Sequence, residues 1–128
     1  MQDEVIYYLC PICGNLLETI NASGQTPTCC GRSMRAFEPG GTDGPKEKHV
    51  PVVTVHGTIV YVKVGSECHP MTDEHHIEWI SILTNKGYQR THLLATEKPE
   101  ALFQIDCDER IIAVYAHCNI HGLWRTTA

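Results

Sequence analysis

Four cysteines near the start of the chain have the residue type and spacing of a metal site. Cys10 and Cys13 flank a Cys-Pro-Ile-Cys-Gly turn, and Cys29 and Cys30 form a second, adjacent pair. A Cys-x-x-Cys turn directs two thiolates at one ion, and four thiolates bind either iron or zinc. Adjacent cysteines can both face one ion only if their turn is distorted. The spacing therefore predicts a tetrathiolate site and leaves open iron, structural zinc and unrelated buried thiols.

Histidines form a second set, because all eight of them lie after residue 48. A lone histidine is more often a surface or hydrogen-bonded residue than a ligand. Several here fall at expected strand ends or loops, where ligands from distant parts of a sequence converge. Three chelating fragments in one small domain therefore favour a second metal site: Glu47-Lys48-His49-Val50-Pro51, Cys68-His69-Pro70-Met71 followed by His75, and Cys118-Asn119-Ile120-His121-Gly122.

Composition and charge indicate the compartment and the partners of the protein. The chain has 128 residues, seven cysteines and a net charge of −5, with no run of lysine and arginine, which argues against nucleic acid as a partner. No apolar run is long enough to span a bilayer, and the opening Met-Gln-Asp-Glu does not resemble a signal peptide. We therefore expect a cytoplasmic protein with no membrane partner, whose reduced cysteines bind metal and form no disulfides.

The chain divides by composition into two parts of unequal size. Residues 4–9 and 15–20 are expected to form short strands around the first cysteine turn, and so small a segment needs a metal to hold it together. Residues 39–45 contain three glycines and two prolines, which is typical of a linker. We therefore predict a metal-stapled domain over residues 1–38, a linker over 39–46 and a second domain over 47–128.

The second domain has an almost purely β pattern. Its apolar segments are rich in β-branched and aromatic residues and are separated by glycine- and proline-containing turns, with no helical period over eleven residues. The predicted fold class is therefore all-β, with a seven-stranded immunoglobulin-like sandwich following the small domain. The expected strands cover residues 50–55, 58–64, 77–83, 88–94, 101–105, 111–116 and 123–126.

The order of these motifs resembles a known family. The fragments EKHVP, HPM followed by His75 and IEWI, and CNxHGxW are similar to the superoxide reductase (neelaredoxin) family. The preceding CPICGN and CCG segments are similar to desulforedoxin. Joined in this order, they resemble desulfoferrodoxin, the two-iron class of superoxide reductase, and the resemblance covers almost the whole chain.

The resemblance implies a ligand set for each of two iron ions. Cys118 would be the axial thiolate of the second iron, whose opposite face stays open for substrate beside the charged pair Glu47 and Lys48. Its equatorial nitrogen ligands would be His49, His69, His75 and His121. The first iron would take Cys10, Cys13, Cys29 and Cys30, with zinc as the alternative metal.

The implied activity is detoxification: one-electron reduction of superoxide to hydrogen peroxide, with electrons from a rubredoxin-like donor. An axial thiolate donates electron density toward the open position, as in thiolate-ligated haem. Superoxide is an anion and the protein is net negative, so a local cation must attract it, and Lys48 is our candidate. Family resemblance further implies that Glu47 helps peroxide leave, that the protein is a homodimer, and that the first iron relays electrons or is structural.

Other readings and several residues remain outside this assignment. A metal-storage or electron-carrier protein would lack the open position, and a dismutase would turn over without a reductant. Trp79 and Trp124 are interpreted as core aromatics, and Cys68 and Cys107 as buried free thiols. His56 and His92 are interpreted as ordinary strand or turn residues. His76 and His117 are interpreted as structural, with proton delivery as the alternative.

Overall fold

The computed structural model describes residues 4–40 and 44–127. The chain divides into two compact units, Met1–Glu38 and Pro39–Ala128. Among the described residues, no helix is long and apolar enough to cross a membrane.

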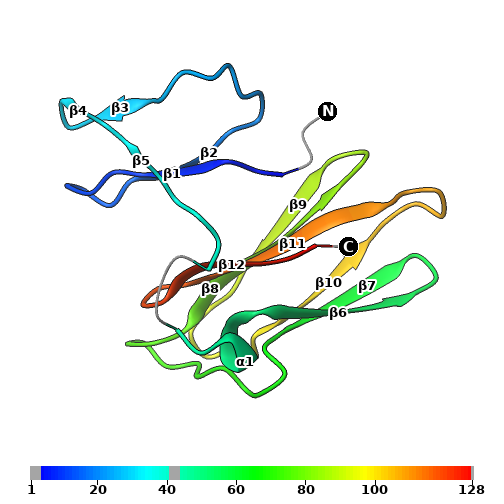
Figure 1. Cartoon of the computed structure of the whole chain (residues 1–128). Helices are drawn as coiled ribbons and strands as arrows, with labels where there is room; N and C mark the ends of the chain where they lie inside the picture. The colour runs from blue at the N-terminus through cyan, green and yellow to red at the C-terminus, as the bar shows by residue number, and fades with distance from the viewer. Residues whose placement is uncertain (1–3, 41–43, 128) are drawn as a thin grey trace. The chain divides into compact units, whose positions relative to one another are not determined.

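The first unit is built from very short strands. An antiparallel sheet has the order β2-β1-β5, with β1 at Tyr7–Leu9, β2 at Leu16–Glu18 and β5 at Arg35–Ala36. A separate hairpin pairs β3 (Thr28–Cys29) with β4 (Arg32–Ser33), as Figure 1 shows. The buried apolar side chains among its described residues are few: Val5, Tyr7, Cys10 and Met34. So small an apolar core agrees with the expectation that this unit needs a metal.

The described part of the second unit contains seven strands in two antiparallel sheets (Figure 1). A three-stranded sheet has the order β10-β7-β6, with β10 at Glu100–Gln104, β7 at Ile59–Val64 and β6 at Pro51–His56. A four-stranded sheet has the order β12-β11-β8-β9, with β12 at Gly122–Thr127, β11 at Ile111–Cys118, β8 at Ile77–Thr84 and β9 at Tyr88–His92. One four-residue helix, α1 (Lys46–His49), precedes β6. The predicted all-β fold class is confirmed.

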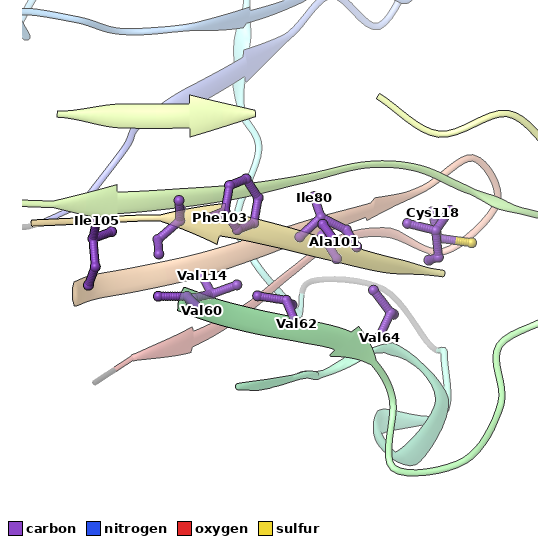
Figure 2. Packing of buried hydrophobic residues seen from close by; sticks show 12 residues of the cluster. Val60, Val62, Val64, Ile80, Ala101, Phe103, Ile105, Val114 and Cys118 are labelled. Atoms are coloured by element: carbon purple, nitrogen blue, oxygen red, sulfur yellow. The ribbon is translucent and has the colours of Figure 1, made fainter. Parts of the chain in front are cut away.

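Side chains from both sheets meet in one apolar core. Val60, Val62 and Val64 alternate along β7, as expected of a strand with one buried face, and pack with Phe103 of β10. Isoleucine and valine side chains of β8 and β11 face them, and Figure 2 shows Cys118 at one end of this row. A thiol at the end of an apolar core is shielded from water on its core side, which prepares it for a metal at the rim.

Five strand ends meet at that rim of the sandwich. Pairing places the start of β6 beside the end of β7, through Pro51 and Val64. The end of β11 lies beside the starts of β8 and β12, since Cys118 pairs with both Ile77 and Gly122. The segments that carry the candidate ligands are therefore brought to one end of the domain by the strand register.

Candidate metal centres

The four cysteines of the first unit converge. Their Sγ atoms all lie within 4.8 Å of one another, with Cys13 and Cys29 separated by 3.6 Å and Cys29 and Cys30 by 4.0 Å. Cys10 is buried and Cys13 is exposed. All four cysteines are free thiols, so each can supply one ligand atom to an ion at the centre of the group.

Two tight turns hold these thiols in place. In the first, the amide of Cys10 donates to Asn15 O and the amide of Gly14 donates to Cys10 O. In the second, Cys30 and Gly31 are the two central residues of the β3–β4 hairpin, with φ of 54° and 72°. Positive φ at both positions is the requirement of a type I′ hairpin turn, and it is uncommon for a residue with a Cβ. This is the distortion expected of adjacent cysteines that face one point.

The cysteines of this cluster differ in pKa. A hydrogen bond from the Cys13 backbone amide lowers the pKa of Cys10 to about 6. Hydrogen bonding with the side chains of Cys13 and Cys10 raises the pKa of Cys30 to about 12. The metal-free cluster therefore favours a thiolate at Cys10 and a thiol at Cys30, and a bound cation would displace the remaining protons.

Four histidine rings and one cysteine gather at the rim of the β-sandwich. Ligand atoms of His49, His75, Cys118 and His121 all lie within 4.8 Å of one another. His69 completes the set, because its Nε2 is 3.2 Å from Nε2 of His49. The same Nε2 of His49 is also 3.1 Å from Nδ1 of His121. The structure thus brings together every histidine fragment singled out in the sequence.

Backbone carbonyls fix which nitrogen of the His49 and His69 rings faces the centre. Nδ1 of His49 lies 2.7 Å from Pro45 O, and Nδ1 of His69 lies 2.6 Å from Pro70 O. A carbonyl can only accept, so each Nδ1 carries the proton and each Nε2 presents a lone pair inward. Two inward lone pairs 3.2 Å apart repel one another unless a proton or a cation lies between them. These donors therefore fit a bound metal.

His75 gives the same indication independently. Its Nε2 is buried and has no hydrogen-bond partner among the residues that the structure describes. A buried polar nitrogen without a partner costs about 1–3 kcal/mol of folding free energy. Because the ligand atoms of His49, Cys118 and His121 surround it within 4.8 Å, a metal is the partner that this nitrogen fits.

Burial keeps the ring nitrogens available for coordination. It lowers the pKa of His49 and His75, and it lowers the pKa of His69 to about 4. Neutral imidazoles are the form that binds metal. Burial also raises the pKa of Cys118, whose Sγ accepts the backbone amide of His121 at 3.4 Å. The metal-free site holds a neutral thiol, and a bound cation would deprotonate it.

The segment of α1 that carries Glu47 and Lys48 is hydrogen-bonded to the turn after β7. Gly65 donates to Val50 O, and Glu67 donates to Glu47 O at 2.9 Å. Gly65 has φ of +82°, and a Cβ there would lie 2.7 Å from the Lys48 carbonyl. Only glycine permits this approach. Glu47 remains exposed and Lys48 half-buried, and the Lys48 charge helps to lower the pKa of His49 and His75, after burial and the neighbouring histidines.

Trp124 does more than fill the core, and sequence reasoning missed this. Its indole stacks on His49 with 4.9 Å between ring centroids, and Nε1 donates to His121 O at 3.0 Å. Gly44 packs so closely that a Cβ there would lie 2.9 Å from both His121 and Trp124. The only sequence signal was its place in the CNxHGxW motif, three residues after the histidine.

Trp79 is buried, as expected, and stacks on His117, at 5.4 Å between centroids and 9° between planes. Two cysteines differ from expectation. The prediction that Cys68 and Cys107 are buried is wrong, because both are exposed. Cys68 lies in the turn that precedes His69, and Cys107 lies in the turn between β10 and β11.

The fold and the two clusters define a class of protein: an all-β chain with one tetrathiolate site and one site of four imidazoles and a thiolate, consistent with two iron centres. The sequence profile of the Desulfoferrodoxin family matches residues 41–127. A desulfoferrodoxin homolog of Archaeoglobus fulgidus is 41% identical, covering 98% of this chain and 99% of that protein. A desulfoferrodoxin of Nitratidesulfovibrio vulgaris is 38% identical over the full length of both chains.

A solved structure extends the likeness to three dimensions. The superoxide reductase from Treponema pallidum is 38% identical and superposes with a TM-score of 0.80, covering 97% of this chain and 99% of that one. The chain belongs to the desulfoferrodoxin family. The predicted class of enzyme, an oxidoreductase of the superoxide reductase family, is confirmed by these relatives.

Proposed function

We propose that this protein reduces superoxide to hydrogen peroxide at an iron ion held by the imidazole–thiolate centre. The proposed ligands are His49, His69, His75, His121 and Cys118, and each reaction consumes one superoxide, one electron and two protons. The convergence of five donor atoms, with lone pairs facing inward and one buried nitrogen lacking a partner, carries this proposal. The full-length likeness to a superoxide reductase supports the choice of substrate.

Bound iron would supply the electron, and the protein would hold it in a fixed environment. Pro45 O and Pro70 O orient the rings of His49 and His69, so that Nε2 of each is the ligand atom. In His121 the inward nitrogen is Nδ1 instead. Cys118 is fully buried at the end of the apolar core, where the thiolate is shielded from bulk water. A buried thiolate donates electron density to the metal without being hydrated itself.

Lys48 would attract the substrate. The protein carries a net charge of −5, so an anion approaches against the overall charge. A half-buried ammonium whose charge is felt by His49 and His75 provides a local positive potential at the cluster. On the family resemblance we assign Glu47 to the release of peroxide; its side chain is exposed, and its backbone carbonyl is held by the amide of Glu67.

The first unit is proposed to be an iron tetrathiolate domain with Cys10, Cys13, Cys29 and Cys30 as ligands, and zinc remains the alternative. Within the proposed domain scheme, residues 1–38 bind this metal, 39–46 connect and 47–128 carry the catalytic centre. A rubredoxin-like donor, a homodimer and a cytoplasmic location stay predictions of the sequence.

Metal content and an absorption spectrum test the assignment. Two irons per chain are expected, with a charge-transfer band of the oxidised second centre that disappears in Cys118→Ser, while the thiolate bands of the first centre persist. Cys107→Ser is the matched control, because it removes an exposed free thiol and should leave the band unchanged. Zinc in the first unit would remove the relay hypothesis only. A second-centre band that survives in Cys118→Ser would contradict the ligand set.

A further inference from the structure

Asparagine residues close both ends of the central β8–β11 strand pair, and they do so in the same way. At one end, the backbone N–H of Asn85 donates to Arg110 O at 3.1 Å, and the side-chain Oδ1 of Asn85 accepts the backbone N–H of Arg110 at 2.7 Å. At the other end, the backbone N–H of Asn119 donates to His76 O at 3.2 Å, and the side-chain Oδ1 of Asn119 accepts the backbone N–H of His76 at 2.9 Å. Each side chain thus replaces one backbone partner where the strand pairing stops.

The side chain of Asn119 makes a second hydrogen bond, this time as a donor. Its Nδ2 donates to Glu74 O at 3.0 Å, so the carboxamide contacts the backbone on both sides of His75. The orientation of the amide is determined, because Oδ1 faces a backbone donor and Nδ2 a backbone acceptor. Asn119 itself directly follows Cys118, which makes it a bridge between two segments that carry proposed ligands.

The segment around His75 is folded on itself and needs an external tether. Thr72 and His75 exchange bonds, through the Thr72 amide to His75 O at 2.9 Å and the His75 amide to Thr72 Oγ1 at 3.1 Å. Nδ1 of His76 donates to Thr72 O at 2.9 Å. These bonds preserve the shape of the turn but do not connect it to Cys118. The Cys118–Ile77 pairing and the Asn119 backbone bond to His76 O connect its end to β11. The Asn119 side chain adds two bonds, one on either side of His75.

We infer that Asn119 is a positioning residue that holds His75 against the Cys118–His121 segment and so retains the metal at the second centre. This inference rests on the proposed function, since it takes His75, Cys118 and His121 as ligands. Asn119 is exposed, so loss of its two side-chain hydrogen bonds should change global stability little and the position of His75 more.

Release of iron tests this role with a control at the opposite end of the same strands. Full-length protein is loaded anaerobically with ferrous iron and mixed with an excess of chelator, and release from each centre is followed. We expect Asn119→Ala to accelerate release from the second centre about tenfold, a change of about the size that one or two lost hydrogen bonds produce. Release from the first centre of the same chain should not change. Asn85→Ala should release iron from the second centre at the wild-type rate.

Two further readouts separate positioning from general loosening. Millimolar imidazole should alter the absorption spectrum of the oxidised second centre in Asn119→Ala, where it competes with His75, and should leave that of Asn85→Ala unchanged. Asn119→Asp keeps an acceptor for the His76 amide but loses the donor to Glu74 O. Its added negative charge favours a bound cation, so faster release from this variant would report the lost bond. It decides the question if Asn119→Ala fails to fold.

The outcomes are distinct. Wild-type release from Asn119→Ala, or equal acceleration in Asn85→Ala, would overturn the positioning role while leaving the proposed function intact. If the wild-type protein holds no iron at the second centre, the proposed function fails and the positioning role fails with it.

Discussion

Lys48→Met removes the cation proposed to attract superoxide while keeping a side chain of similar length. The helix backbone should persist, because it is held by the amides of Gly65 and Glu67 and not by the ammonium group. Lys46→Met is the matched control, since it removes the same charge from the same four-residue helix at an exposed position. Both variants have the same net charge, so any difference between them reports the local field.

The expected magnitude follows from Coulomb's law. A unit charge about 7 Å from the approaching anion contributes about 0.6 kcal/mol in bulk water and about 2.4 kcal/mol at an effective dielectric constant of about 20. Lys48 is half-buried and its charge helps to lower the pKa of two of the proposed ligands, His49 and His75, which places the interaction between these limits. We expect a loss of about 1–2 kcal/mol, equivalent to a roughly five- to thirtyfold lower rate constant.

Pulse radiolysis of the reduced protein measures this second-order rate constant over a range of salt concentrations. The wild-type rate should fall with added salt, because screening weakens the attraction, and the Lys48→Met rate should lose this dependence. Lys46→Met should stay within about twofold of wild type. Equal effects of the two substitutions would refute the reasoning, because net charge and not the position of Lys48 would then control the encounter.

Three further predictions concern the metal sites and stability. Trp124→Phe keeps an aromatic ring beside His49 but removes the Nε1–H bond to His121 O. It should lower the free energy of unfolding by about 1–3 kcal/mol and accelerate iron release from the second centre. The control Trp79→Phe should lower the melting temperature without changing release. Metal removal should unfold the first unit, with its few buried apolar side chains, while hydrogen exchange in the β-sandwich stays slow; a folded metal-free unit would contradict this. In metal-free protein the pKa of His69 is about 4, below the roughly 6.5 of an unfolded imidazole, so the unfolded state binds more protons between these values. Urea midpoints should therefore fall as pH drops from about 6.5 toward about 4 and stay flat above that window; His69→Gln should flatten the slope, and an unchanged slope would argue against this source.

Much of the β-sandwich could be predicted from local pattern. Strands such as β7 alternate valines with polar residues, and this alternation determines which face is buried. Boundaries were less predictable: β11 continues to Cys118, two residues beyond the expected end, because its last pairs lie across an irregularity with β8. Where a strand stops depends on its partner's register, which a single sequence does not contain.

The candidate ligands could be predicted from motif order, but their supporting residues could not. Nothing in the local sequence distinguishes Asn119 from any polar loop residue, because its role depends on a segment more than forty residues away. Trp124 likewise acquires its contact with His49 only when the β6 and β12 ends meet. Cys68 and Cys107 were wrongly expected to be buried, since composition gives the preference of a residue type and not the direction of one side chain.

The dependence of turnover on an electron donor tests the central claim most directly. Reduced protein is mixed with excess superoxide, and the consumption of superoxide and the formation of peroxide and oxygen are measured with and without a reduced rubredoxin. A reductase consumes one superoxide and forms one peroxide per oxidised second centre, then stops until the donor is added. Continued consumption at the same rate without a donor, with release of oxygen, would contradict the account and identify a dismutase instead.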